Sequence, residues 1–275
     1  MKPFLKTKDH SVSQEEFTLL YDESSDMLVT YPQPNELEKY YDSDAYISHT
    51  DASESFVDKI YQAVKKYSLN KKVRLINGLT SDKKSLLDIG AGTGDFLLTA
   101  KNKGWKIDGI EPNKSARKKA SEKGLKLEED LSALQKEKYN VISLWHVLEH
   151  LPNLEEQIKT IKSKLEKDGV LIVAVPNYKS YDAKHYKNFW AAYDVPRHLW
   201  HFSKSAIENI FGEHQMKVVK TKPMLFDAFY VSLLSEKYKS GKQNLFKAFY
   251  RGLRSNIYAM RTKEHSSVIY IIKNA

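Results

Sequence analysis

A glycine-rich turn that follows a short apolar run is the stretch of this sequence best suited to ligand chemistry. Gly90, Gly92 and Gly94 would let the backbone bend sharply and approach a ligand where a Cβ atom would collide. The dinucleotide fingerprint is G-x-G-x-x-G, so the third glycine stands one position early here. Asp88, at the end of the apolar run, would repel a pyrophosphate and attract a cationic cofactor. The spacing favours a cationic cofactor, with a nicotinamide dinucleotide as the alternative on this stretch alone.

Residues 88–94 read D-I-G-A-G-T-G and resemble the first motif of class I S-adenosylmethionine-dependent methyltransferases. S-adenosylmethionine carries an ammonium and a sulfonium group, and both positive charges suit a carboxylate at position 88. The resemblance implies that S-adenosylmethionine is the cofactor and that Asp88 and the three glycines bind it.

Acidic residues also follow the next two expected strands and suit the nucleoside part of a cofactor. Glu111 ends the strand expected at 106–110 and lies about 20 residues beyond Gly90, the distance at which a carboxylate can accept both ribose hydroxyls. This feature fits NAD as well as S-adenosylmethionine. The resemblance further implies that Asp130 approaches the adenine amino group, with Leu131 beside the ring.

The stretch 139–153 contains V-L-E-H and resembles the fourth-strand motif of bacterial methyltransferases grouped with the ubiquinone-biosynthesis O-methyltransferases. Trp145 and His146 are expected at the C-terminal edge of the sheet, where open α/β folds bind ligands. The resemblance places Trp145 beside the cofactor. In some relatives an acidic residue at the place of His146, together with the matches of Glu149 and His150, is linked to a divalent metal. His146 departs from that pattern, so the use of a metal is left open.

A loop at 188–203 is rich in aromatic residues, histidines and paired charges, and a similar W-x-x-x-D-x-P-R-H-x-x-H-F segment occurs in the same broad family. Histidine removes a proton near neutral pH, as methylation of an oxygen or nitrogen can require. The histidines therefore favour an oxygen or nitrogen of a small-molecule or glycan-like acceptor. The candidate catalytic residues are His146, His150, Asp194, Arg197, His198 and His201, of which Asp194 and Arg197 are expected to pair and fix the loop.

Strand and helix patterns alternate after the glycine turn, which predicts an α/β fold with a mostly parallel, doubly wound sheet. We expect strands at 85–89, 106–110, 125–128, 139–144, 169–175, 216–222 and 267–273, and helices at 95–103, 113–123, 147–151, 155–166 and 204–212. The resemblance implies the seven-stranded, Rossmann-like class I methyltransferase sheet, with the last strand antiparallel beside the sixth.

The flanking segments predict a cap and an insertion. Residues 1–52 are polar and tyrosine-rich and predict an irregular N-terminal cap, with Tyr40, Tyr41, Tyr46, His49 and Thr50 as candidates to line a substrate pocket. Residues 53–275 would form the methyltransferase domain, which opens with two helical stretches, the first capped by Ser53. Residues 223–264 would form a helical insertion or lid. Its basic, amphipathic part at 246–262 suits a lid, a homodimer contact or a peripheral membrane contact.

Composition narrows the function classes. The chain has no cysteine, no apolar run long enough to span a membrane and no secretory leader, so we expect a cytoplasmic protein. Its net charge of +9 is too diffuse to indicate nucleic-acid binding, and it has no N-P-P-Y tetrapeptide of the kind found in enzymes that methylate nucleic-acid amino groups. The sequence thus favours methyl transfer from S-adenosylmethionine. The alternatives are an NAD-dependent oxidoreductase and a non-catalytic S-adenosylmethionine-binding scaffold.

Overall fold

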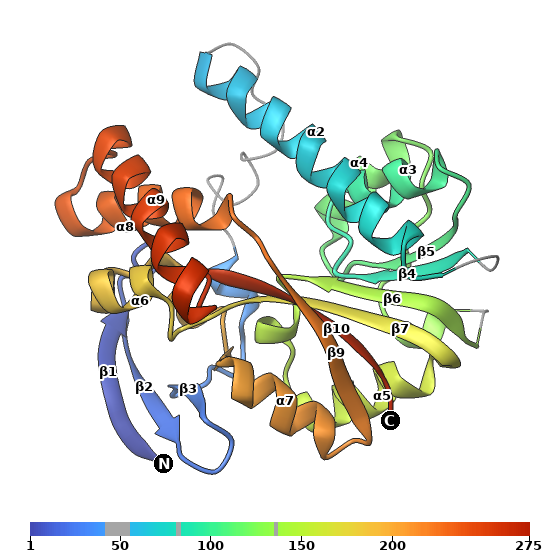
Figure 1. Cartoon of the computed structure of the whole chain (residues 1–275), viewed down its shortest axis with the longest axis horizontal. Helices are drawn as coiled ribbons and strands as arrows, with labels where there is room; N and C mark the ends of the chain where they lie inside the picture. Colours follow the sequence, from blue (N-terminus) through green and yellow to red (C-terminus); the bar gives the residue numbers. More distant parts are fainter. Residues whose placement is uncertain (42–55, 81–83, 135–136) are drawn as a thin grey trace.

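A six-stranded sheet forms the centre of the molecule in the computed structural model, which describes residues 1–41, 56–80, 84–134 and 137–275 (Figure 1). Its strands, in the order β5-β4-β6-β7-β10-β9, are β5 (Lys106–Ile110), β4 (Ser85–Ile89), β6 (Tyr139–Trp145), β7 (Leu165–Pro176), β10 (Ser267–Asn274) and β9 (Met216–Pro223). The first four are parallel, whereas β10 runs antiparallel between β7 and β9. The predicted parallel sheet and antiparallel last strand are therefore confirmed.

The prediction of a strand at 125–128, which would have given the central sheet a seventh strand, is wrong. The segment forms one parallel bridge, between Ile110 and Glu128, and then leaves the sheet. Leu125 and Leu127 are its two apolar residues and both are buried, but Lys126 between them is exposed. The segment runs along the outer side of β5, so no further strand holds it in place beyond that bridge.

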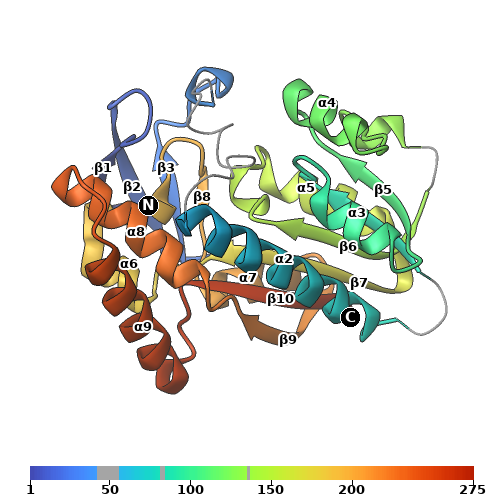
Figure 2. The same cartoon turned by 90° about the horizontal axis from the view of Figure 1, so that it is seen from above.

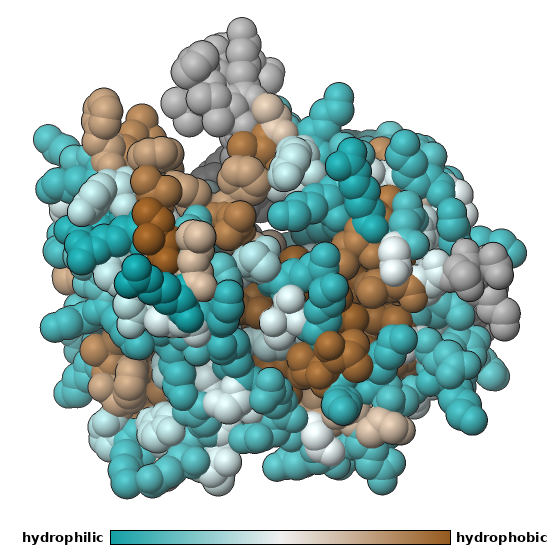
Figure 3. All heavy atoms as spheres, in the orientation of Figure 1, coloured by the Kyte–Doolittle hydropathy of each residue, from teal (hydrophilic) through white to brown (hydrophobic). Residues whose placement is uncertain are grey.

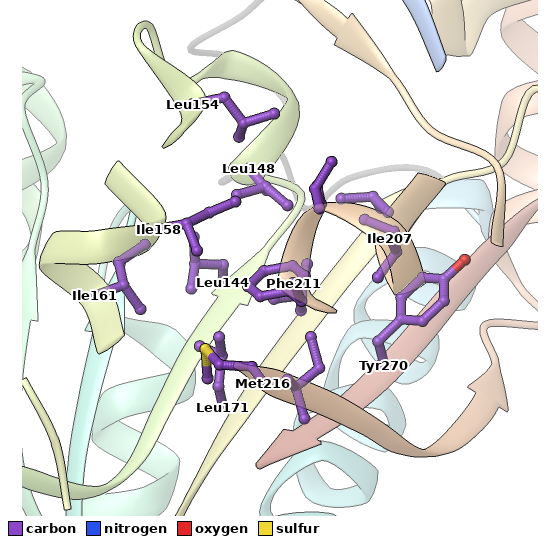
Figure 4. Packing of buried hydrophobic residues seen from close by; sticks show 14 of the residues in the cluster. Leu144, Leu148, Leu154, Ile158, Ile161, Leu171, Ile207, Phe211, Met216 and Tyr270 are labelled. Atoms are coloured by element: carbon purple, nitrogen blue, oxygen red, sulfur yellow. The ribbon is translucent and has the colours of Figure 1, made fainter. Parts of the chain in front are cut away.

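Helices cover both faces of the sheet because successive strand residues point to opposite sides. Leu87 and Ile89 pack with α5 (Leu154–Ser163) and α7 (Lys204–Gly212), and Figure 4 shows this cluster from close by. Leu86 packs on the other face. The helices there are α2 (Phe56–Asn77), α3 (Asp95–Lys101) and α4 (Lys114–Glu122). The sheet is thus doubly wound, as the sequence predicted.

Helix α2 is one continuous helix of 22 residues, so the prediction of two helical stretches is wrong. Val73 and Ile76 of its last turns are buried against the sheet. Figure 1 shows the last turns of α2 beside β4. The expected N-cap Ser53 lies outside the described residues.

The prediction of an irregular N-terminal segment is also wrong, because the described part of it forms a sheet. Strands β1 (Lys2–Lys8), β2 (Glu16–Asp22) and β3 (Met27–Tyr31) are antiparallel, and β8 (Trp200–His201) adds a fourth strand. Phe17 and Leu19 of β2 alternate inward and are buried. This short alternation of apolar and polar residues indicates a strand, but the polar, tyrosine-rich composition of the segment made it hard to recognise. The cap boundary at residue 52 stays a prediction.

The insertion before β10 is helical, as predicted. Helices α8 (Asp227–Ser240) and α9 (Leu245–Thr262) pack side by side, with α6 (Tyr181–Tyr186) next to them (Figures 1 and 2). In the described ranges, no helix combines the length and the apolar character that crossing a membrane requires.

Candidate active site

The glycine turn lies at the edge of the sheet where β4 ends. A Cβ atom on Gly90 would stand 2.4 Å from Val147 Cγ2, so packing alone requires glycine there. Gly92 has a φ of +55°, a conformation that favours glycine, and a Cβ on it would meet no atom within 4 Å. The turn is therefore packed against the protein at Gly90 and open to a ligand at Gly92.

Glu111 faces this turn from the end of β5. Its Oε2 accepts a hydrogen bond from the Gly92 amide at 2.7 Å, and its Oε1 accepts one from the Asn113 amide at 2.9 Å. Two backbone donors thus fix the carboxylate beside the open side of the turn. The structure thus brings together Glu111 and Gly92, two of the residues that the sequence proposes for cofactor binding.

Asp88 is buried in the last part of β4, and its Oδ1 accepts a hydrogen bond from the Ser143 hydroxyl at 2.6 Å. Burial, with the charge of Glu111, raises the pKa of Asp88 to about 7 against the opposing effects of Ser143 and Lys72. Near neutral pH, this carboxyl is poised between its two protonation states. A nearby positive charge on a ligand would favour the ionised form.

Lys72 of α2 is a functional candidate that the sequence reasoning missed. Its ammonium lies 4.2 Å from the centre of the Trp145 ring. The negative charge of Asp88 raises the pKa of Lys72 and so opposes the effect of burial. Burial lowers the pKa of Lys72, and no carboxylate of the described chain forms an ion pair with it. The available signal was its spacing of four residues from Ile76, which places it towards the sheet-facing side of α2.

Trp145 lies at the end of β6, where it was expected. Its ring packs edge-on against Phe96 of α3, with centroids 5.6 Å apart. Its indole Nε1–H is buried and has no hydrogen-bond partner among the residues described. The site thus keeps one unused donor next to the Lys72 cation.

Asp130 and Leu131 lie beyond the bridge at Glu128. Asp130 is exposed, and its Oδ1 accepts a hydrogen bond from the Ser132 amide at 2.7 Å, which begins a short 3₁₀ turn. Leu131 is half-buried and packs against the core. The contact of these two residues with adenine stays a prediction.

His146 follows β6 with a φ of +59° and lies between two carboxylates. Its Nε2 is 2.9 Å from Asp227 Oδ2, and its Nδ1 is 3.3 Å from Glu149 Oε1. Burial opposes a charge on the ring, but the two carboxylates outweigh it and raise the pKa of His146 to about 10. His146 is therefore protonated at neutral pH and does not suit the role of a general base in this arrangement.

His150 and His198 lie with their rings 4.5 Å apart and nearly perpendicular. His150 Nδ1 is 3.0 Å from the Arg197 carbonyl oxygen and 3.0 Å from the Tyr41 hydroxyl. His198 Nδ1 is 2.9 Å from the Ala192 carbonyl oxygen, and burial with the nearby His150 lowers its pKa well below the usual value. A carbonyl can only accept, so both Nδ1 atoms donate and both Nε2 atoms are left as acceptors.

The same two histidines and Glu149 could hold a metal ion. One ligand atom from each of the three residues lies within 4.8 Å of the others. Glu149 is buried, and in the described parts of the chain its Oε2 has no hydrogen-bond partner. This set differs from the one that the resemblance implied, because His146 is held by Asp227 and His198 joins from the loop.

The remaining loop candidates hold the loop on the N-terminal sheet. Arg197 donates to Asp194 at 2.6 Å, as predicted, and also to Asp9 at 3.0 Å, and its side chain is 1% exposed. His201 is buried with its Nε2 3.0 Å from the Thr30 hydroxyl, and burial lowers its pKa to about 3. We therefore do not place Asp194, Arg197 and His201 against the acceptor. Of the pocket-lining candidates, Tyr40 is buried, and residues 46, 49 and 50 lie outside the described ranges.

A glycine turn after the first central strand and a carboxylate after the next define a nucleoside-binding α/β domain. Residues 60–221 match the sequence model of a family described as a methyltransferase domain, and the chain belongs to this family. Two curated relatives are the ubiquinone biosynthesis O-methyltransferases of Actinobacillus pleuropneumoniae serotype 5b and Haemophilus ducreyi. Each is 33% identical over 115 residues, which cover 37% of this chain and 48% of the relative. The chain thus spans about half the length of the curated relatives that it matches.

Solved structures share the fold at low sequence identity. The magnesium protoporphyrin IX methyltransferase of Synechocystis PCC 6803 with bound SAH has a TM-score of 0.57 at 15% identity, covering 87% of this chain and 98% of its own. A possible histamine N-methyltransferase of Thermotoga maritima has a TM-score of 0.53 at 18% identity, covering 80% and 97%. The chain therefore has the class I methyltransferase fold, with six strands in its described central sheet.

Proposed function

We propose that this protein transfers a methyl group from S-adenosylmethionine to an oxygen or nitrogen of a small-molecule or glycan-like acceptor. The observation that supports this most directly is the open glycine turn at Gly92 with Glu111 bound to its amide and Asp88 beside it. Because the chain belongs to a methyltransferase family, we infer that the reaction at this site is methyl transfer.

We assign a different part of the cofactor to each of the residues at the sheet edge where β4 ends. We assign the ribose hydroxyls to Glu111. Asp88 and Lys72 offer opposite charges, which suit the ammonium and the carboxylate at the amino-acid end of the cofactor. The bound cofactor supplies an electrophilic methyl group on a sulfonium. Fixing both reactants in line can contribute on the order of 7–11 kcal/mol to the acceleration.

On the acceptor side, we assign the general base to His150. It is half-buried, and its Nδ1 is held by the Arg197 carbonyl oxygen, so its Nε2 is the ring nitrogen left to accept a proton. As the acceptor atom forms its bond to the methyl carbon, His150 Nε2 takes the proton that this atom loses. General-base catalysis of this kind contributes about 10²–10⁴-fold.

Calorimetric titration of S-adenosylhomocysteine tests the cofactor. We expect micromolar affinity, about −8 kcal/mol, for the wild-type protein and a loss of at least about tenfold in Asp88→Ala. The exposed Glu122→Gln variant is the matched control and should bind like the wild type. No binding to a folded wild-type protein would overturn the proposal. Binding of NAD instead would favour an oxidoreductase.

Turnover tests the acceptor chemistry and separates an enzyme from a scaffold. Formation of S-adenosylhomocysteine is followed with a panel of hydroxyl and amino acceptors. His150→Asn should lower kcat by about 10²–10⁴-fold and leave cofactor affinity unchanged. Tight cofactor binding without turnover on any acceptor would support the non-catalytic scaffold.

A further inference from the structure

Helix α9 packs on the rest of the protein through its small side chains. Ala248, Gly252, Ser255 and Ala259 are buried along one stripe of the helix. A Cβ on Gly252 would stand 2.6 Å from Phe229 Cδ1, so α8 and α9 approach too closely there for any larger side chain. Of the large apolar side chains of α9, Phe249 also contacts α8, where its ring stacks on Phe229 with the centroids 5.5 Å apart.

The other large apolar side chains of α9 are mostly exposed to solvent. Phe246 is 91% exposed and Met260 is 70% exposed. The exposed apolar residues of α9 recur every three or four positions: Leu245, Phe246, Phe249, Tyr250, Leu253, Ile257 and Met260. Figure 3 shows apolar side chains gathered over the α8 and α9 end of the molecule. A soluble monomer rarely exposes a continuous apolar stripe of this kind without using it.

A basic stripe runs beside the apolar one. It consists of Lys247, Arg251, Arg254 and Arg261, and α9 has no acidic residue. A shallow hollow between α6, α8 and α9 brings Lys239, Lys247 and Arg251 next to Phe246 and Tyr250. The surface thus combines cations with neighbouring apolar side chains, the combination by which helices lie in the interface of anionic membranes.

We propose that this α9 surface, formed by the apolar and basic stripes of α9, docks on membranes that contain anionic lipids. Charge complementarity favours this occupant over a second copy of the chain. A symmetric dimer through α9 would place two basic stripes near each other, and the helix itself offers no carboxylate to pair with them. The inference goes beyond methyl transfer and does not depend on it.

Co-sedimentation of the full chain with vesicles tests the docking. One set of vesicles is phosphatidylcholine, and the other contains about 30 mol % phosphatidylglycerol, which gives the surface a negative potential. We expect binding to the anionic vesicles at least about tenfold tighter than to the neutral ones, and weaker binding at about 0.5 M salt. Phe246→Ser with Met260→Ser, and separately Lys247→Glu with Arg254→Glu, should each reduce it at least about tenfold.

Controls come from other exposed positions. Val219→Ser removes an exposed apolar side chain from β9, and Lys103→Glu with Lys106→Glu reverses two exposed charges near β5. Both should bind vesicles like the wild type. Equal sedimentation with neutral and anionic vesicles, or α9 variants that bind like the wild type, would overturn the proposal. A dimer in analytical ultracentrifugation that the Phe246 and Met260 changes convert to a monomer would assign the surface to a second copy instead.

Discussion

His146 Nε2 lies 2.9 Å from Oδ2 of Asp227, and this contact joins the end of β6 to the first turn of α8. The two residues are 81 positions apart in the sequence. The contact therefore links the helical insertion to the edge of the sheet at which we propose the cofactor site. Glu149 accepts from the other ring nitrogen of His146, so the ring is held from both sides.

The first prediction concerns this link. Both Asp227→Asn and His146→Asn should increase amide hydrogen exchange in the first turn of α8, because each removes the charge-assisted hydrogen bond. Asp227→Asn also removes a negative charge from a helix N-terminus, whereas His146→Asn does not. The control is Asp168→Asn, which changes an exposed residue in the first half of β7. If only Asp227→Asn loosens the turn, the helix dipole and not His146 holds it.

The second prediction concerns Asp88 and pH. A carboxyl whose pKa rises from 3.8 to about 7 on folding favours its protonated form in the folded state. Its contribution to stability is complete below the unfolded pKa and is lost as the pH rises through the folded pKa, which amounts to about 4 kcal/mol at most. Asp88→Asn should therefore raise the free energy of unfolding at pH 8, and the gain should shrink towards pH 4.

Urea unfolding between pH 4 and pH 8 measures this effect, and calorimetry measures its functional counterpart. Asp88→Asn should bind S-adenosylmethionine more weakly although it is more stable, because the ionised carboxylate that attracts the cationic cofactor is gone. Wild-type affinity should rise between pH 6 and pH 8, since ligand binding favours the ionised form. A stability gain independent of pH would contradict the buried-charge explanation.

Local sequence patterns were sufficient for the strand ends and the glycine turn. The sequence predicted β4 and β5 with the bounds that the structure shows, and it placed a candidate cofactor residue directly after each of them. Parallel neighbours end at one edge, so the order of such residues along the chain predicts their meeting in space. The expected strand at 125–128 failed because two apolar residues do not hold a segment at the outside of a sheet.

Contacts between distant segments could not be predicted in this way. Arg197 reaches Asp9 across 188 positions of the sequence, and that pair decides the role of the loop. The loop histidines indicated acid–base chemistry, but burial and hydrogen bonding determine which of them can serve as a general base. His201 is buried in β8, the fourth strand of the N-terminal sheet, whereas His150 is only half-buried. Neither the burial of His201 nor the partial exposure of His150 can be predicted from a local sequence pattern.

The third prediction tests the structural role of Arg197. Arg197→Met should lower the free energy of unfolding by about 3–5 kcal/mol, because it leaves the buried carboxylate of Asp9 without its partner. Asp9→Asn added to Arg197→Met should recover part of the loss. Chemical denaturation measures both, with the exposed Arg74→Met as the control. A loss below about 1 kcal/mol would show that this pair is not what fixes the loop.

The last prediction concerns Lys72, whose ammonium lies over Trp145 without an ion pair from the described carboxylates. We expect Lys72→Met to weaken S-adenosylhomocysteine binding by about 10- to 100-fold, because a charge-assisted hydrogen bond to a ligand carboxylate contributes about 1.5–3 kcal/mol. The neighbouring exposed Lys71→Met is the matched control.

A ligand that lacks the amino-acid end makes this test specific. Methylthioadenosine keeps the nucleoside and the sulfur but has no carboxylate, so Lys72→Met should leave its affinity unchanged. Lys72→Arg keeps the positive charge and should recover part of the affinity for S-adenosylhomocysteine. Equal losses for both ligands would mean that Lys72 supports the site through its packing on Trp145. A loss confined to S-adenosylhomocysteine would instead identify Lys72 as the cation that receives the cofactor carboxylate.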